Sequence, residues 1–266
     1  AYPTWAICFN LCPMILQTTL PYNPLRPMRL PGVSPLTLDA WLRVDDAYAG
    51  QMALRAQLLA THGCVVLDRV GDTHALEDEA LRMIVAHLPA EFAVTSRAVT
   101  CPDGRVVVLD SAPPLEVATQ IIQDDICLLI KPEGAAEHIL TAASLCFPAS
   151  WRLSEKLGRA LVPIHAPVVS YGGDLAARVQ RLFDGLQPGR PLWRFNALWY
   201  DDATLYQPRS SQTPRDIIDP VRAPYLRSER QCLVRLPVSG GVIFSIHTYV
   251  VPTQNILTQF SAEQRF

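Results

Sequence analysis

The residue best suited to metal chemistry in this sequence is one histidine in apolar surroundings. His165 stands in the proline-bounded stretch Ile164-His165-Ala166-Pro167-Val168. A neutral imidazole in such a stretch can ligate haem iron or a transition metal. It can equally be a core histidine whose ring binds a backbone carbonyl. The pattern alone leaves both interpretations open.

Charged and polar side chains gather at two predicted strands. Arg227, Glu229 and Arg230 lie close together at the start of one strand, while Arg194 and Asn196 share a face of another. Arginine presents a fixed fork of donors that matches a carboxylate. Surface ion pairs are the alternative interpretation. These groups indicate a pocket for an anion or a cofactor and do not say which.

Composition excludes several classes of protein. The chain has 266 residues, of which 49% are hydrophobic, and a net charge of −2. This composition favours a packed globular protein over a disordered one. Without a run of basic residues, a nucleic-acid partner is not expected. The sequence also lacks a hydrolase elbow, a P-loop, a dinucleotide fingerprint and an H-E-x-x-H motif.

Cysteine usage and hydropathy bear on the compartment. The seven cysteines are scattered and none forms a C-x-x-C pair, so neither a disulfide framework nor a zinc site is expected. The apolar run from Trp5 to Leu16 is interrupted by Asn10 and Pro13. It is too short to span a bilayer, which takes ~20 residues. We therefore expect a cytoplasmic protein with no membrane partner.

The positioning elements follow from hydrophobic periodicity. Apolar residues spaced three, four or seven apart predict helices, at 41–59, 76–88, 115–130, 150–156 and 174–186. In the third of these, Gln123 and Asp124 fall on the opposite face and are expected to be solvated. β-branched or alternating stretches predict strands, at 105–109, 138–147, 193–199, 229–236 and 242–250.

The order of these elements predicts the fold class. The stretch Pro237 to Gly241 (PVSGG) has the turn chemistry of a hairpin between the last two strands, and residues 201–225 read as a long surface loop. Helices early and an antiparallel meander late indicate an α+β protein. We expect a proline-rich lead segment at 1–36, followed by one domain at 37–266. That domain has N-terminal helices at 37–133 and a sheet region at 134–266.

Several motifs resemble one known family. They run in order from Leu38-Asp39-Ala40-Trp41-Leu42 through Ile122-Gln123-Asp124-Asp125-Ile126, Cys146-Phe147-Pro148, Glu155-Lys156-Leu157-Gly158-Arg159, Ile164-His165-Ala166-Pro167-Val168, Trp193-Arg194-Phe195-Asn196 and Leu226-Arg227-Ser228-Glu229-Arg230 to Leu236-Pro237-Val238-Ser239-Gly240. In order and spacing they resemble the haem-dependent oxidative N-demethylase alpha subunit-like family, over roughly Pro24 to Pro252. The chain departs from the family pattern at Ala197, where a tryptophan is usual, and at His247, where an arginine is usual.

The resemblance implies a cofactor, a reaction and a fold. It implies haem b held in a PAS-like antiparallel sheet with flanking helices, on which the N-terminal helical portion packs. The implied reaction is oxidation of a small secondary amine by dioxygen, which releases formaldehyde. The sequence has no flavin, NAD or iron–sulfur signature, so electrons would come from a flavin/iron–sulfur reductase subunit. A non-catalytic haem sensor and a haem-free interaction subunit are the alternatives.

The resemblance also implies roles for individual residues. His165 is expected to be the proximal ligand of the haem iron. Arg194, Arg227 or Arg230 is expected to contact a haem propionate, and Asn196 is placed with them as a cofactor-binding residue. Glu229 is expected to be the catalytic residue that binds the cationic amine or relays protons, with a structural partnership to Arg227 as its alternative role.

Overall fold

A computed structural model describes residues 14–26, 32–165, 173–210, 213, 216 and 218–260. Its α-helices are α1 (Tyr48–His62), α2 (His74–Ala86), α3 (Pro114–Ile121), α4 (Leu161–His165), α5 (Gly173–Gly185) and α6 (Thr253–Phe260), with short 3-10 helices η1 (Leu38–Ala40), η2 (Gly63–Val65) and η3 (Leu153–Glu155). Its strands are β1 (Ser34–Pro35), β2 (Leu67–Arg69), β3 (Ala93–Val94), β4 (Ala98–Thr100), β5 (Val106–Val108), β6 (Asp125–Ile130), β7 (Ile139–Ser144), β8 (Leu192–Tyr200), β9 (Tyr225–Arg235) and β10 (Val242–Pro252).

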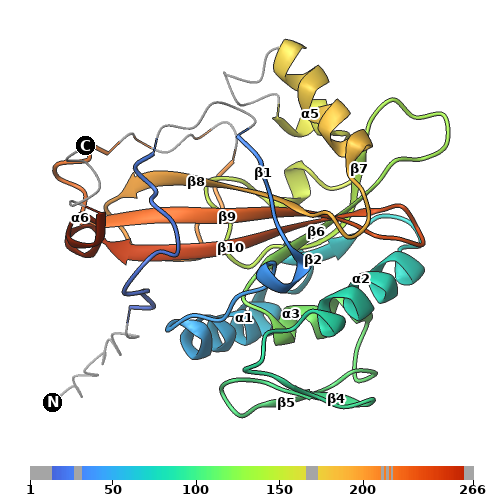
Figure 1. Ribbon diagram of the computed structural model, residues 1–266, viewed down its shortest axis with the longest axis horizontal. Coiled ribbons are helices and arrows are strands. Elements are labelled where there is room, and N and C mark those ends of the chain that lie inside the picture. Colours follow the sequence, from blue (N-terminus) through green and yellow to red (C-terminus); the bar gives the residue numbers. More distant parts are fainter. Residues whose placement is uncertain are drawn as a thin grey trace, which may run out of the picture.

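The main sheet is antiparallel throughout its described strands. Their order is β1-β8-β9-β10-β6-β7-β2, so β10 lies between β9 and β6 at the centre (Figure 1). A separate sheet contains β3, β4 and β5. Mixed helices and antiparallel sheet confirm the predicted α+β class.

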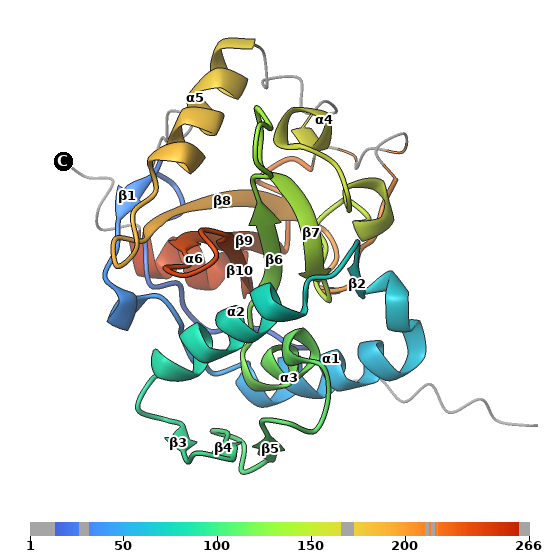
Figure 2. The ribbon, with the colours of Figure 1, turned by 90° about the vertical axis from the view of Figure 1, so that its right-hand side faces the viewer.

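Helices lie on both sides of the main sheet. Figure 2 shows α1, α2 and α3 on one side, with β3–β5 beyond them, and α4 and α5 on the other. Cys232, Val234 and Ile243 point toward the first side and join its hydrophobic core. Leu233 and Val242 point toward the second side and pack with α4 and α5. Because strand side chains alternate between faces, strands β6 to β10 contribute to both cores.

The predicted helix at 115–130 is wrong in its second half. Helix α3 ends at Ile121, and residues 125–130 form β6 in the middle of the sheet. The apolar stretch of β6 is buried on both faces, so it carries no alternation that would mark it as a strand. Gln123 and Asp124 are also not solvated, because their exposed fractions are 1% and 2%.

The predicted first helix begins later than its periodicity indicates. Trp41 closes η1, and α1 starts only at Tyr48. Trp41 is nevertheless fully buried, because its indole Nε1 donates to Ser245 Oγ of β10 at 2.9 Å. It therefore shares the core with α1 without belonging to that helix.

The hairpin of β9 and β10 is confirmed, and helix α2 holds its turn. The backbone N–H groups of Val238 and Ser239 donate to the two carboxylate oxygens of Glu79 at 2.7 and 2.9 Å. Glu79 is buried, and these bonds, together with the Ser239 hydroxyl, hold its pKa below the usual value against the effect of burial. The carboxylate thus fixes the turn between the two longest strands of the sheet.

Part of the lead segment packs on the sheet. The Gln17 side chain donates to the carbonyl of Thr248 and accepts from the N–H of Val250, both on β10. Leu20 is buried beside α6. The division of the chain at residue 36 stays a prediction. Among the described helices, none is long and apolar enough to cross a membrane.

Candidate functional site

The candidate site lies on the face of the sheet that carries α4 and α5. Pairing of β8 with β9 sets Arg194 opposite Gln231, Asn196 opposite Glu229 and Leu198 opposite Arg227. These side chains alternate with those that point to the other face. The predicted residues Arg194, Asn196, Arg227 and Glu229 therefore share one face of the sheet.

His165 ends helix α4 above this face. It is half-buried, and its Nδ1 lies 2.8 Å from the carbonyl oxygen of Leu161. Burial lowers the pKa of His165, as do the charges of Lys156 and Arg194, while the bond to Leu161 opposes them. The ring is therefore neutral at pH 7. With Nδ1 as the donor, the lone pair of the neutral ring belongs to Nε2.

This geometry agrees with both interpretations of His165. A histidine that ligates a metal usually donates its other ring N–H to a carbonyl or a carboxylate, which fixes the ring. The bond to Leu161 is of this kind, and it is also the bond that a purely structural histidine would make. The neighbours Ala166, Pro167 and Val168 lie outside the described residues.

Glu229 is a buried acid held by two amides. Its exposed fraction is 6%. Asn196 and Gln231 donate to its Oε2 at 3.0 and 2.9 Å, and its backbone N–H donates to Asn196 Oδ1 at 3.1 Å. Within the described chain, Oε1 has no hydrogen-bond partner, and Glu229 forms no ion pair with Arg227. The site thus holds an acid with one engaged oxygen and one oxygen available as an acceptor.

Arg194 is a half-buried cation on the same face. Its Nε is buried and has no hydrogen-bond partner. Burial lowers the pKa of Arg194, and the charge of Glu229 opposes this. A buried donor without an acceptor costs ~1–3 kcal/mol, so this position favours a ligand that brings an acceptor.

Arg227 uses its donors within the protein. It donates to the carbonyl oxygens of Phe147 at 2.7 Å and Leu205 at 3.0 Å. Its guanidinium also lies 5.8 Å from the ring centroid of Tyr200. These contacts fasten the segment after β8 to the sheet. That Arg227 contacts a cofactor stays a prediction.

Arg230 lies on the opposite face from His165. It donates to the carbonyl oxygens of Ala40 and Trp41, both at 2.6 Å, and its guanidinium lies 5.5 Å from the Trp193 ring. The structure therefore groups Arg230 with η1 and not with the other predicted site residues.

Lys156 belongs to the site, and the residue pattern gave it no role. It is half-buried, directly after η3, and its Nζ lies 4.4 Å from the ring centroid of Trp151. Burial lowers the pKa of Lys156, whereas Cys127 and Glu229 raise it. Two signals pointed to it: it is one of only two lysines in the sequence, and it lies within a family motif.

The walls around these polar groups are apolar. Buried and partly buried side chains of α4, α5, η3 and the sheet form one cluster, which includes Trp151, Leu157, Leu161, Ile164, Phe183, Leu233 and Phe244. A pocket of about 340 Å³ adjoins it and is lined by Val65, Leu145, Pro148, Trp151, Arg152, Leu153, Ser154, Tyr206 and Pro208. Trp151 contributes to both and also contacts Lys156.

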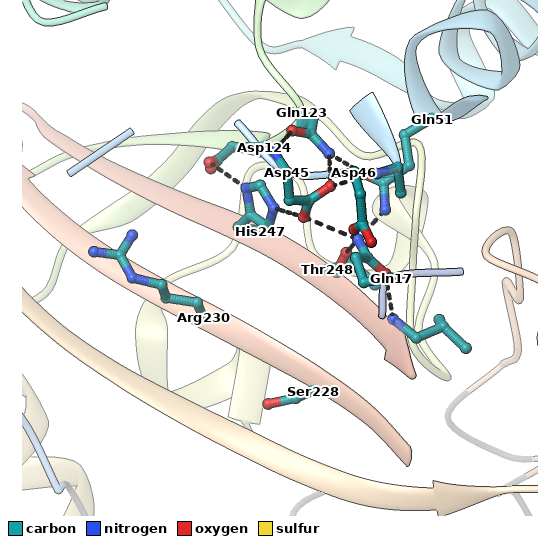
Figure 3. A network of polar contacts seen from close by, with 12 residues as sticks. Gln17, Asp45, Asp46, Gln51, Gln123, Asp124, Ser228, Arg230, His247 and Thr248 are labelled. Carbon is teal, nitrogen blue, oxygen red and sulfur yellow. Dashed lines mark hydrogen bonds and ion pairs between the residues drawn. The ribbon is translucent and has the colours of Figure 1, made fainter. Parts of the chain in front are cut away.

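The opposite face of the sheet holds a second polar group, centred on His247 (Figure 3). His247 Nε2 lies 2.9 Å from Asp45 Oδ2, and Nδ1 lies 3.5 Å from Asp124 Oδ1. Gln17 and Gln123 donate to the two oxygens of Asp45. These contacts explain why Gln123 and Asp124 are buried: they face partners that are distant in the sequence.

The arrangement defines a class: an α+β domain whose main sheet carries a half-buried imidazole, a buried acid and a half-buried arginine on one face, beside an apolar cluster. Comparison with protein families agrees. The model of the family described as haem-dependent oxidative N-demethylase, alpha subunit-like, matches residues 32–266. This match covers most of the chain, and the chain belongs to that family.

Haem fits the donor set of this face. The cofactor offers an iron that takes a neutral imidazole as an axial ligand, an apolar ring and two carboxylates. On this face the neutral imidazole of His165 is of the type that ligates haem iron, the buried Nε of Arg194 lacks an acceptor such as a carboxylate, and an apolar cluster packs beside them. The group on the other face lacks the half-buried imidazole, since His247 is held between two carboxylates.

Proposed function

We propose that this chain is the haem b-binding catalytic subunit of an oxidative N-demethylase. It oxidises a small secondary amine with dioxygen and releases formaldehyde and the shorter amine. Electrons come from a flavin/iron–sulfur reductase subunit. The observation that carries the proposal is the family match over residues 32–266. The description "alpha subunit-like" itself supports a partner subunit.

His165 is the proposed axial ligand of the haem iron. Its half-buried, neutral ring and the bond from Nδ1 to Leu161 support this role, because they orient Nε2 as the ligating atom. Haem, when bound, supplies the redox chemistry with dioxygen that removes the methyl group. The protein supplies the ligand, the orientation of the substrate and the exclusion of water.

Glu229 is the proposed residue for the amine. A small secondary amine is a cation at neutral pH, and the open Oε1 of a buried carboxylate can accept its N–H. Asn196 and Gln231 fix the carboxylate through Oε2 and so position Oε1. In its alternative role, the same carboxylate relays protons at the site.

Two further observations support the proposed PAS-like sheet and the proposed cytoplasmic location. Counted from β6, five successive strands form a sheet in which the first and the fifth are central neighbours, and helices α4 and α5 are inserted between the second and the third. This supports a PAS-like sheet. The described cysteines, from Cys64 to Cys232, are free thiols, which supports a reducing compartment such as the cytoplasm.

The absorption spectrum of the purified protein tests the cofactor. We expect a Soret band in the wild type, and its loss in His165→Ala while the circular dichroism stays unchanged. A normal Soret band and an unchanged ferric spectrum in His165→Ala would remove His165 as the ligand. No haem in the wild type would leave an interaction subunit as the function.

Formaldehyde release tests the reaction. With a chemical reductant or a reductase, oxygen and small secondary amines, we expect formaldehyde in amounts that follow amine consumption. Haem binding without amine-dependent formaldehyde would leave a non-catalytic sensor as the function. Omission of the amine and omission of the reductant are the controls.

A further inference from the structure

Within the described chain, two cations on the face of the sheet that carries α4 and α5 lack a protein acceptor. Within the described chain, the Nζ of Lys156 makes no hydrogen bond or ion pair and lies only over the ring of Trp151. Arg194 likewise has a buried Nε with no partner. Both residues are half-buried, so water replaces the missing acceptors only in part.

Other buried cations of the protein differ from Lys156 and Arg194 in having protein acceptors. Arg55 is paired with Asp125 at 2.9 Å, and Arg227 and Arg230 each donate to two or more backbone carbonyls. Each of these three cations has at least one acceptor from the protein, although the Nε atoms of Arg55 and Arg227 also lack a partner. Within the described chain, by contrast, Lys156 and Arg194 make no hydrogen bond or ion pair at all. A cation removed from water without an acceptor destabilises the fold, so its retention indicates an anion that arrives from outside the chain.

The two cations lie near the same imidazole. Arg194 points from β8 toward the face that carries α4. Lys156 lies over Trp151, which packs in the same cluster as Leu161 and Ile164 of α4, and the charges of both cations act on His165. The two residues come from different elements, one after η3 and one on β8. An anion that meets both must therefore carry charge at two positions near the axial ligand. A haem with its two carboxylates is such an anion.

We propose that Lys156 and Arg194 bind the two propionate carboxylates of haem, with Lys156 as the second anchor. The inference rests on the proposed function, because it takes haem as the cofactor. The alternative role of Lys156 is that of a permanent counter-ion to Glu229, whose charge also reaches it. In that role Lys156 would not distinguish charged from esterified haem.

Titration of the haem-free protein with haem and with haem dimethyl ester separates these roles. The ester keeps the ring and the iron but has no carboxylate charge. Wild type should bind haem about tenfold or more tightly than the ester, since the ester cannot form the charge-assisted hydrogen bonds that the carboxylates form. Lys156→Gln and Arg194→Gln should each lose about tenfold in haem affinity and leave the affinity for the ester unchanged.

The chain offers matched controls. Lys131, the other lysine, pairs with Asp184 on α5, and Lys131→Gln should bind both ligands as the wild type does. Arg190 is exposed just before β8, and Arg190→Gln serves in the same way for Arg194. Lys156→Arg keeps the charge, so it should recover most of the haem affinity.

The outcomes are distinct. Equal affinity of the wild type for haem and its ester would overturn the inference while haem binding, and with it the proposed function, survived. If Lys156→Gln lost affinity for haem and for the ester to the same extent, the lysine would have a structural role, and the inference would again be overturned. If the wild type bound neither ligand, both the inference and the proposed function would fall. If Lys156→Gln did not fold, the affinities of the wild type and of Lys156→Arg for haem and for the ester would still test the inference.

Discussion

The buried imidazole of His247 makes the stability of this protein depend on pH. Burial alone would lower the pKa of His247, but the carboxylates of Asp124 and Asp45 outweigh it and raise the pKa to about 9, from a usual 6.5. The same contacts hold the pKa of Asp45 below its usual value although burial acts in the opposite direction. At neutral pH the folded protein therefore carries an imidazolium between two carboxylates.

The size of the effect follows from linkage. Each unit by which the folded pKa exceeds the unfolded pKa is worth about 1.4 kcal/mol, so charged His247 contributes about 3 kcal/mol. Because the folded pKa is raised, this stability is fully present below pH 6.5. It is lost as the pH rises toward 9, where the folded protein no longer binds an extra proton. His247→Gln should lack this contribution.

Urea unfolding at pH 6, 7, 8 and 9 measures the contribution of charged His247 to the free energy of unfolding. The free energy of unfolding of the wild type should fall relative to that of His247→Gln by about 3 kcal/mol between pH 6 and pH 9, with unchanged m-values. His74→Gln is the control, because His74 is exposed at the start of α2. A constant difference between wild type and His247→Gln across this range would refute the reasoning.

Three further predictions concern single side chains. Glu229→Gln should weaken amine binding and leave haem content intact, as measured by amine titration and by the Soret band; loss of haem or of folding would indicate a structural role instead. Asp125→Asn should lower the free energy of unfolding by about 3–5 kcal/mol, since it breaks the buried pair with Arg55; a loss below 1 kcal/mol in urea unfolding would contradict this. Trp41→Phe should cost about 2 kcal/mol by leaving the Ser245 hydroxyl without its partner, and Ser245→Ala in the same chain should recover part of it; additive losses would argue against that hydrogen bond.

Hydrophobic periodicity and turn residues predicted several elements near their observed positions. Helix α2, helix α5 and strands β8 to β10 lie close to their predicted positions, and the PVSGG turn joins the last two strands as expected. The failure at β6 has a physical cause. Strand β6 is covered on both faces and is apolar without interruption from Ile126 to Ile130, and its residues Ile126 and Leu129 also satisfy a helical spacing.

The site was predictable only where sequence neighbours or strand alternation defined it. Alternation placed Arg194 and Asn196 on one face, and the register of β8 with β9 adds Glu229. Arg230 and Arg227 lie on opposite faces, as alternation requires for residues three apart in one strand. The sequence did not separate them because the predicted strand began at residue 229, whereas β9 begins at Tyr225. Lys156 meets Trp151 and the sheet only through the packing of η3, which no local pattern describes.

The position of β10 determines when this protein can fold. As the last strand of the described chain and the one between β9 and β6, it joins two groups of strands that share no other border. During synthesis, the edges of β6 and β9 that pair with β10 stay without a partner strand until residue 252 has left the ribosome. The side chain of Gln17 cannot form its hydrogen bonds before then either, since its partners Thr248 and Val250 are 231 and 233 residues away. Contacts of such long range make folding slow and leave exposed edges that favour aggregation, so the sheet of this chain can be completed only once β10 has been synthesised.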